Sequence, residues 1–127
     1  MKPEIIATDR APKAVAAYSQ AIRANGFLFL SGQIPLDPQS GELVGGDVAV
    51  QARRVMDNLG AVLTAGGSSF ERVVRATIYL VDMADFARVN EVYASYFSGE
   101  HRPARVTVAV AALPRAARVE IEMTALA

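Results

Sequence analysis

Two charged residues lie in segments that otherwise read as β-strands, Arg105 in Ala104–Ala111 and Glu120 in Arg118–Leu126. Because side chains alternate along a strand, Arg105 has small or apolar neighbours on its own strand, whereas Glu120 shares its face with Arg118, Glu122 and Thr124. A guanidinium in such a strand needs an anion, since an unpaired buried charge is costly. Strand patterning alone favours a structural ion pair with Glu120 or Glu122. The alternative is that the planar guanidinium of Arg105 binds a substrate carboxylate in bidentate fashion, while Glu120 acts as a base that orients water.

Other polar residues are weaker candidates. Tyr18 and Ser31 lie at the ends of two predicted hairpin strands, where either could be ordinary strand chemistry. Asn90 falls on the apolar face of a predicted helix and needs a partner, for which a backbone carbonyl is the first expectation. The paired glycines of the chain punctuate helices and match no phosphate-binding loop.

The composition narrows the possible chemistry. The 127 residues include no Cys and one His, so a thiolate nucleophile, an iron–sulfur cluster and a two-histidine zinc site are excluded. Thirteen basic and thirteen acidic residues give zero net charge, which provides no general attraction to nucleic acid or to an anionic membrane. Catalysis must therefore come from Arg, carboxylates, hydroxyls or the backbone.

The start of the chain is polar and contains Pro3 and Pro12, and no stretch is apolar and long enough to span a bilayer. We expect a cytoplasmic protein with one domain over residues 1–127. Hydrophobic residues make up 52% of this short chain, which favours self-association.

Strand signals occupy the two ends of the chain. Glu4 to Ala7 predicts an edge strand, and Tyr18 to Ala24 with Phe27 to Ser31 predicts a hairpin joined by Asn25-Gly26 in a type I′ turn. The sequence FLFLSG is apolar on both faces, so its strand is expected to be covered on both sides.

Two helices are expected in the middle of the chain. The first follows the N-cap Asp47 and ends at Gly66-Gly67, with an apolar stripe that predicts a purely packing role. The second runs from about Ala84 to Phe97, and a strand from Val73 to Val81 separates the two. The order β-β-β-α-β-α-β-β predicts an α+β fold, a mixed sheet with both helices on one face. Its other face should pack against another subunit.

Five stretches together resemble the Rid family (RidA/YjgF) of imine and enamine deaminases. They are AP-(x)5-YSQA at 11–21, LSGQIPLDPQSGEL at 30–43, QARRVMDNLGAVLTAGG at 51–67, RPARVTVAVAALP at 102–114 and VEIEM at 119–123. The stretches reach across nearly the whole chain with their spacing intact. Together they are specific, although each alone is weak.

The resemblance implies a chorismate-mutase-like domain that forms a homotrimer around a central barrel, with active sites at the subunit interfaces. It implies hydrolysis of 2-aminoacrylate and related 2-imino acids to 2-oxo acids and ammonia, as in a 2-iminobutanoate/2-iminopropanoate deaminase, without a metal or organic cofactor. The expected partners are the small substrate and other copies of the chain, with no nucleic acid and no membrane.

The family's site residues map onto this sequence one by one. The carboxylate-binding arginine corresponds to Arg105, and the acid that positions water corresponds to Glu120. The remaining positions that line the family's substrate site are Tyr18, Ser31, Gly32, Asn90 and Thr107.

Two departures from the family pattern affect this mapping. Many members have Gly-Pro before the tyrosine, where this chain has Ala16-Ala17, so the loop that carries Tyr18 could differ. Many members also have Cys where this chain has Thr107. Because imine hydrolysis requires no thiol, we expect Thr107 to tune the site through its backbone hydrogen bonds without abolishing activity.

Three other functions are compatible with parts of this pattern. A non-catalytic trimer could bind 2-oxo or amino acids through Arg105, although binding alone has no need of Glu120. RNA cleavage or translational inhibition, labels that some relatives carry, would fit poorly with zero net charge and one His. A deaminase for another enamine, such as one derived from a pyrimidine or an aminomuconate, would keep the arginine and change the pocket wall.

Overall fold

A computed structural model describes residues 2–127, and its element order confirms the predicted one. Three short 3₁₀ turns connect the main elements, at Phe70–Arg72, Met83–Asp85 and Pro114–Ala116. The strands and helices are β1 (Glu4–Ile6), β2 (Ala21–Ala24), β3 (Phe27–Gln33), α1 (Val48–Ala65), β4 (Val73–Leu80), α2 (Phe86–Ala94), β5 (Ala104–Ala109) and β6 (Val119–Leu126).

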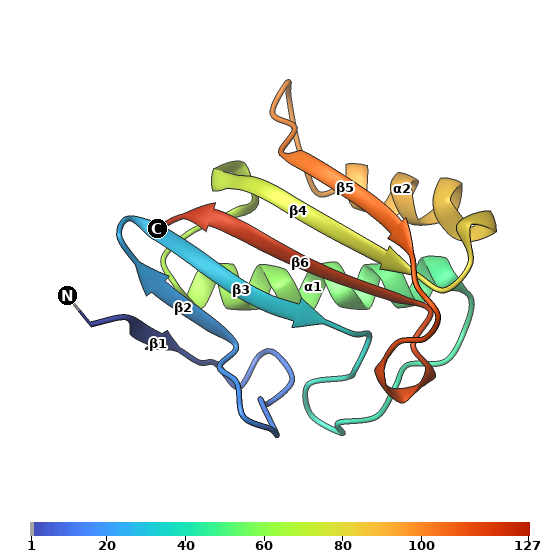
Figure 1. Cartoon of the computed structure of the whole chain (residues 1–127), viewed down its shortest axis with the longest axis horizontal. Helices are drawn as coiled ribbons and strands as arrows, with labels where there is room; N and C mark the ends of the chain where they lie inside the picture. The colour runs from blue at the N-terminus through green and yellow to red at the C-terminus, as the bar shows by residue number, and fades with distance from the viewer. Residues whose placement is uncertain (1) are drawn as a thin grey trace.

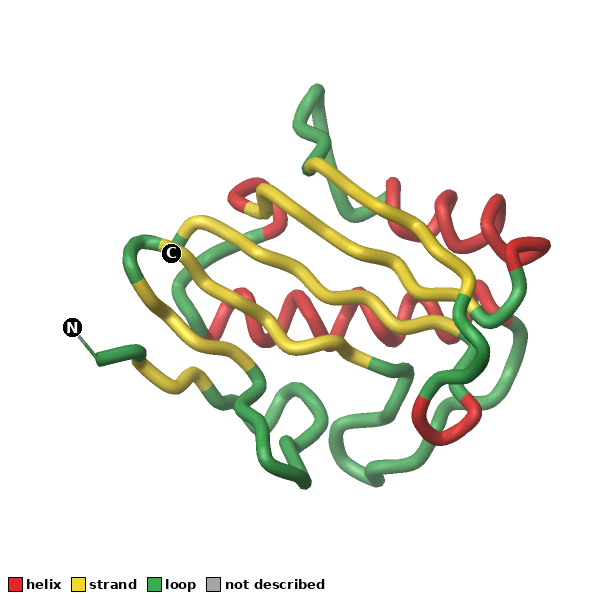
Figure 2. Tube along the Cα trace, in the orientation of Figure 1, coloured by secondary structure: helices red, strands yellow, loops and turns green. Residues whose placement is uncertain are grey.

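The six strands form one mixed sheet in the order β1-β2-β3-β6-β4-β5. Only β4 and β5 pair in parallel, because α2 carries the chain back between them, and the other neighbours are antiparallel. Both helices lie on the same side of this sheet (Figures 1 and 2). The predicted α+β fold with two helices on one face is therefore confirmed, and β1 is an edge strand as expected.

Local sequence signals explain where the main elements begin and end. Asn25 and Gly26 have φ values of 52° and 82°, the two positive angles that a type I′ hairpin needs. The Asp47 side chain accepts hydrogen bonds from the Ala49 and Val50 amides at 3.0 and 3.1 Å, which fixes the start of α1. The predicted apolar stripe of α1 is buried against the sheet: Ala52, Val55, Met56, Leu59, Val62 and Leu63.

The second helix is shorter than predicted. Asp82 caps a 3₁₀ turn by accepting a hydrogen bond from the Ala84 amide at 2.9 Å, so regular α2 begins only at Phe86. It ends at Ala94, where the Ser95 hydroxyl donates a hydrogen bond to the Val92 carbonyl. The fifth strand likewise stops at Ala109, two residues before the predicted end. No helix in residues 2–127 is long and apolar enough to cross a membrane.

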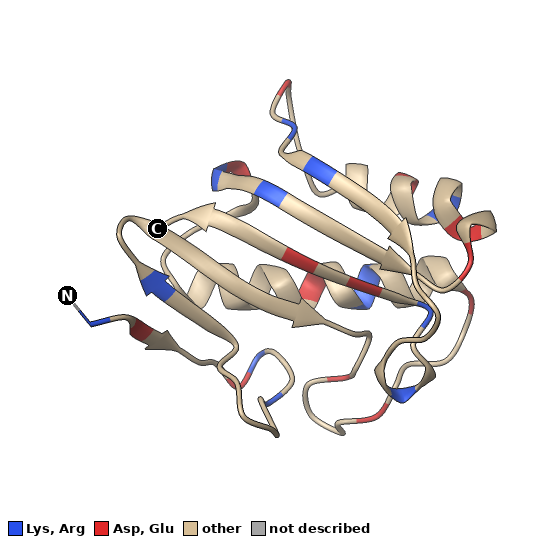
Figure 3. Cartoon of the chain, viewed as in Figure 1, with Lys and Arg blue, Asp and Glu red and all other residues tan. Residues whose placement is uncertain are grey.

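The face of the sheet away from the helices is uncovered in the chain. Phe27 and Phe29 of β3 are 36% and 46% exposed, so the expectation that this strand is covered on both sides is wrong for the single chain. Charged positions of β6 lie in the middle of this sheet (Figure 3). The large apolar side chains exposed on this bare face are Ile5, Phe27, Phe29, Val106, Val108 and Leu126.

Candidate functional site

Arg105 lies on β5 and faces α2. Its Nη1 donates a hydrogen bond to Asn90 Oδ1 at 2.7 Å. The guanidinium carbon is 5.6 Å from the ring centre of Phe86 and 5.0 Å from that of Tyr93, within cation–π range of both. The three α2 side chains therefore hold the guanidinium in place without neutralising it, because none of them carries a negative charge.

The structural ion pair that strand patterning favoured is wrong. Arg105 is opposite Ala76 on β4, whereas Glu120 is opposite Tyr79, three residues further along the same strand. Positions three apart on a strand point to opposite faces, so Arg105 faces the helices and Glu120 faces the bare side. Among residues 2–127 Arg105 forms no salt bridge.

The expectation for Asn90 is also wrong. A backbone carbonyl was its expected partner, but its side-chain oxygen accepts from Arg105 instead. One turn of a helix brings residues four apart onto the same side, so Phe86 and Asn90 reach the guanidinium together. Tyr93, three residues further on, completes the same face.

The Arg105 side chain borders a small cavity of about 390 Å³, the arginine pocket, and Asn90, Tyr93, Arg102 and Pro103 also line it. Thr107 lies two residues further along the same face of β5. The hydroxyl groups of Thr107 and Tyr93 are buried and have no hydrogen-bond partner within the described part of the chain. Unsatisfied buried hydroxyls are uncommon, so the region around the arginine pocket leaves these two hydroxyl groups for a further partner.

Glu120 lies on the bare side of β6 and is half-buried. Its carboxylate lies against the backbone of Gly32, so closely that a Cβ at position 32 would collide with Oε2. Burial raises the pKa of Glu120, and the nearby negative charge of Glu122 raises it further. No residue between 2 and 127 forms a salt bridge with Glu120.

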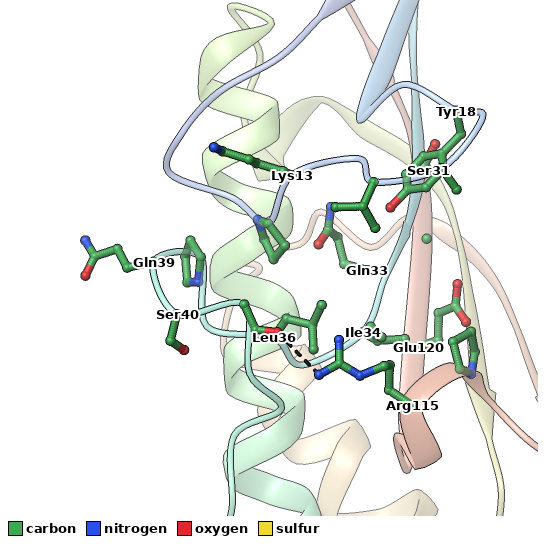
Figure 4. Close-up of a pocket in the computed structure, with 17 residues that line it drawn as sticks. Lys13, Tyr18, Ser31, Gln33, Ile34, Leu36, Gln39, Ser40, Arg115 and Glu120 are labelled. Atoms are coloured by element: carbon green, nitrogen blue, oxygen red, sulfur yellow. Dashed lines mark hydrogen bonds between the residues drawn. The ribbon is translucent and has the colours of Figure 1, made fainter.

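Glu120 lines a second, larger cleft of about 740 Å³, which we call the glutamate cleft (Figure 4). Tyr18, Ser31 and Gly32 line the same cleft, as the sequence predicted for one shared site. The Ser31 hydroxyl donates to the Ser19 carbonyl at 2.6 Å, which joins the β3 end of the cleft to the loop that carries Tyr18. Tyr18 is 49% exposed and so is free to meet a ligand.

Two buried amides hold the loops around the glutamate cleft. The Gln20 amide nitrogen donates to the Pro12 carbonyl at 2.7 Å, and its oxygen accepts from the Thr8 amide at 2.7 Å, which ties down the loop before Tyr18. Asn58 of α1 donates to the Leu36 carbonyl at 3.0 Å on the other wall. The first helix therefore also positions a cleft loop, which the prediction of a purely packing helix omitted.

Of the seven predicted site residues, the structure groups four in the glutamate cleft and two at the arginine pocket, with Thr107 beside the latter. It does not bring the two groups together within one chain. Sequence reasoning missed Phe86 and Tyr93 as supports of Arg105, although their spacing around Asn90 was visible. Residues 2–127 also place no three His, Cys, Asp or Glu side chains where they could hold a metal ion.

Comparison with known proteins identifies the family. The family model described as Endoribonuclease L-PSP matches residues 8–127. The 2-iminobutanoate/2-iminopropanoate deaminase of Mus musculus is 48% identical over 123 residues, which cover 97% of this chain and 90% of the mouse protein. The chain therefore belongs to the Endoribonuclease L-PSP family, also known as the RidA/YjgF family, which includes imine deaminases.

Solved structures agree with this membership. A protein of the conserved Rid family from Yersinia pestis superimposes with a TM-score of 0.97 at 44% identity, covering 99% of this chain and all of that chain. TdcF of Escherichia coli, solved with bound serine, gives a TM-score of 0.92 at 40% identity and covers 98% of both chains. The names across the family differ in the activity they state, so membership alone does not fix the reaction.

Proposed function

We propose that this chain is a deaminase that hydrolyses 2-aminoacrylate and related 2-imino acids to 2-oxo acids and ammonia. The observation that carries the proposal is Glu120, a carboxyl of raised pKa that lines an open cleft without a paired cation. A raised pKa makes the Glu120 carboxylate a stronger proton acceptor than an ordinary glutamate, as a general base requires. The deaminase name of the mouse relative and the serine in the E. coli relative support a substrate of amino-acid size.

Arg105 would bind the substrate carboxylate. Asn90 takes one of its five N–H donors, and the two aromatic rings hold its plane, so further donors remain to form a bidentate pair with a carboxylate. Asn90 and Thr107 would complete this half of the site, with the unpartnered Thr107 hydroxyl or its backbone available to the substrate.

Glu120 would orient and deprotonate the attacking water. The oxygen of that water adds to C2 of the protonated imine to give a carbinolamine, while its proton passes to the Glu120 carboxylate. Glu120 then returns the proton to the amino nitrogen, and the C–N bond breaks with its electron pair leaving on ammonia. As the C2 carbonyl forms, the Glu120 carboxylate accepts the hydroxyl proton, which then passes to ammonia to give ammonium. Proton transfer of this kind contributes about 10²–10⁴-fold to a rate. Tyr18, Ser31 and Gly32 would line the substrate beside it.

These roles require two chains, because Arg105 and Glu120 face opposite sides of one sheet. We propose that the protein is a homotrimer whose bare sheet faces line a central barrel, with each site built from the arginine pocket of one subunit and the glutamate cleft of the next. Exposed apolar side chains on the two sides of β6 and β4 support this arrangement, Phe29 on β3 and Val106 and Val108 on β5, since burial of apolar surface favours association. The site needs no cofactor, because a protonated imine is already electrophilic.

The direct test generates 2-iminobutanoate in solution with an amino acid oxidase and measures its hydrolysis in competition with semicarbazide, which traps the imine. We expect the wild-type protein to accelerate release of 2-oxobutanoate and ammonia, and we expect Arg105→Ala to lose about 10²-fold or more in kcat/KM because a charge-assisted bidentate contact is removed. A protein that binds 2-oxobutanoate but releases no ammonia from the imine would be the non-catalytic binder instead. An Arg105→Ala variant with the native rate would contradict the assigned role.

A further inference from the structure

The turn between β5 and β6 has an unusual backbone. Arg115 and Ala116 have φ values of 60° and 59°, in the left-handed region that glycine and asparagine favour. Two consecutive residues of other types in this region carry conformational strain, and strain of this kind is concentrated at functional sites. Arg115, in this strained turn, lines the glutamate cleft.

The contacts of Arg115 within the chain are weak. Its Nη2 is 3.5 Å from the Gly41 carbonyl oxygen and 3.8 Å from Glu42 Oε2. The side chains of Arg115 and Glu42 are 50% and 79% exposed, and such surface ion pairs contribute little to stability. Most of the five donors of this guanidinium are therefore available to a ligand.

Arg115, in the turn before β6, and Glu120, on β6, both line the glutamate cleft (Figure 4). The charged side chains that line this cleft are Lys13, Arg115 and Glu120, so cations outnumber the proposed base. The cleft volume of about 740 Å³ is in the range of pockets that hold drug-sized ligands. An imino acid of three or four carbons leaves much of it empty, including the end near Arg115.

We propose that Arg115 is a specificity-determining residue that recognises a second carboxylate at the far end of the substrate. The preferred substrates would then be dicarboxylic 2-imino acids, such as 2-iminoglutarate, which one water converts to 2-oxoglutarate and ammonia. The C1 carboxylate pairs with Arg105 of the neighbouring subunit, C2 lies beside Glu120, and the distal carboxylate pairs with Arg115. This inference rests on the deaminase function proposed above.

The test compares kcat/KM for 2-iminoglutarate and 2-iminobutanoate in the wild-type protein and three variants, Arg115→Asn, Arg115→Lys and Arg53→Gln. Arg115→Asn removes the guanidinium while asparagine still tolerates the left-handed backbone. Arg53→Gln removes the same charge from an exposed position on α1 that lines neither cavity, and serves as the matched control. We expect the wild type to favour 2-iminoglutarate, and Arg115→Asn to lower the ratio of the two kcat/KM values by about 10- to 100-fold, as loss of a charged hydrogen bond predicts. In Arg115→Lys, which keeps a positive charge, the ratio of the two kcat/KM values should be close to that of the wild type. In Arg53→Gln it should equal the wild-type ratio.

The outcomes separate this inference from the proposed function. Hydrolysis of 2-iminobutanoate with no preference for 2-iminoglutarate, and a ratio unaffected by Arg115→Asn, would overturn the inference and leave the deaminase function intact. Acceleration of neither substrate by the wild type would overturn both. The thermal midpoint of Arg115→Asn, measured alongside, shows that the variant is folded.

Discussion

The arginine pocket and the glutamate cleft are built in opposite ways. Arg105 is held by side chains, a neutral amide and two aromatic rings on one helix face, which fix its plane and leave its charge unpaired. Glu120 is held by the backbone, because only a glycine at position 32 leaves room for its carboxylate. Side-chain contacts therefore position the Arg105 cation, whereas the missing side chain at Gly32 makes room for the Glu120 anion.

The arginine pocket and the glutamate cleft also differ in how their surroundings act on the charged group. The cation–π contacts with Phe86 and Tyr93 hold the guanidinium of Arg105 in one position. Burial and Glu122 disfavour the charged form of Glu120, which brings its pKa closer to neutrality. One half of the proposed site is therefore a fixed binding group and the other a group that can exchange a proton.

The largest expected effect comes from removing the proton-accepting group without changing its shape. Glu120→Gln should lower kcat for 2-iminobutanoate by about 10²–10⁴-fold, the contribution of a positioned general base. KM should change little, because Arg105 still binds the carboxylate. An unchanged kcat would remove the proposed base from the mechanism.

The same variant should be more stable at neutral pH. A group whose pKa is raised in the folded state favours folding at low pH, and that contribution is lost as pH rises through the folded-state pKa. Above its folded-state pKa Glu120 is in its unfavourable charged form, and glutamine is its neutral counterpart. We expect Glu120→Gln to raise the thermal midpoint at pH 7 and to match the wild type near pH 3. A lower midpoint at pH 7 would mean that the carboxylate stabilises the fold.

The next effect concerns the backbone that holds Glu120. Gly32→Ala places a methyl group against Oε2 and should shift the carboxylate, with a loss in kcat of about 10- to 100-fold, since misplacement by 1 Å can cost that much. The thermal midpoint should change little, because the atom displaced is the end of a flexible side chain. Gly45→Ala is the matched control, because a Cβ there meets nothing within 4 Å and the backbone is not left-handed. Full activity in Gly32→Ala would show that Glu120 needs no such support.

A smaller effect is expected from the aromatic support of Arg105. Tyr93→Leu removes a cation–π partner worth about 0.5–2 kcal/mol, so kcat/KM should fall by about 2- to 30-fold, mainly through a higher KM. Tyr93→Phe keeps the ring and removes an unsatisfied buried hydroxyl, so it should keep activity with an equal or higher thermal midpoint. Equal losses in both variants would indicate that the hydroxyl, rather than the ring, is what the site uses.

The smallest effect is a shift along the pH axis. The proposed mechanism requires ionised Glu120, so we expect the raised pKa to place the acid limb of the kcat/KM profile above that of an ordinary glutamate. Glu122→Gln removes the second cause of the raised pKa, and the acid limb should move to lower pH by a fraction of a unit. Glu91→Gln, which neutralises an exposed residue on α2, should leave the profile in place. A shift to higher pH would contradict the stated cause.

Much of the fold could be predicted from local signals. The hairpin turn at Asn25-Gly26, the cap at Asp47 and the apolar stripe of α1 each depend on residues close together in the sequence, and each was confirmed. The end of α2 depends on tertiary contacts, and there the prediction was wrong. The coverage of the second face of β3 depends on another subunit and stays a prediction. The alternation of side chains along β5 and β6 correctly predicted which residues of the same strand share a face with Arg105 and with Glu120.

The relation between those two strands could not be predicted. Alternation gives the faces of each strand but not which face of one matches which face of the other, because β4 lies between β5 and β6. The predicted ion pair failed for this reason. The strained turn at Arg115 also left no sequence signal, since neither Arg nor Ala favours a positive φ.

The central claim is that each site takes Arg105 from one chain and Glu120 from another, and subunit mixing tests it most directly. Arg105→Ala and Glu120→Gln chains, each nearly inactive alone, would be co-expressed in equal amounts and purified together through a tag that both chains carry. In randomly mixed trimers, the chain that contributes Arg105 to an interface is intact there with a probability of one half, and so is the chain that contributes Glu120. About one interface in four is therefore complete. We predict recovery of about a quarter of the wild-type rate of 2-iminobutanoate hydrolysis. Activity no higher than that of the two variants measured separately would contradict the claim.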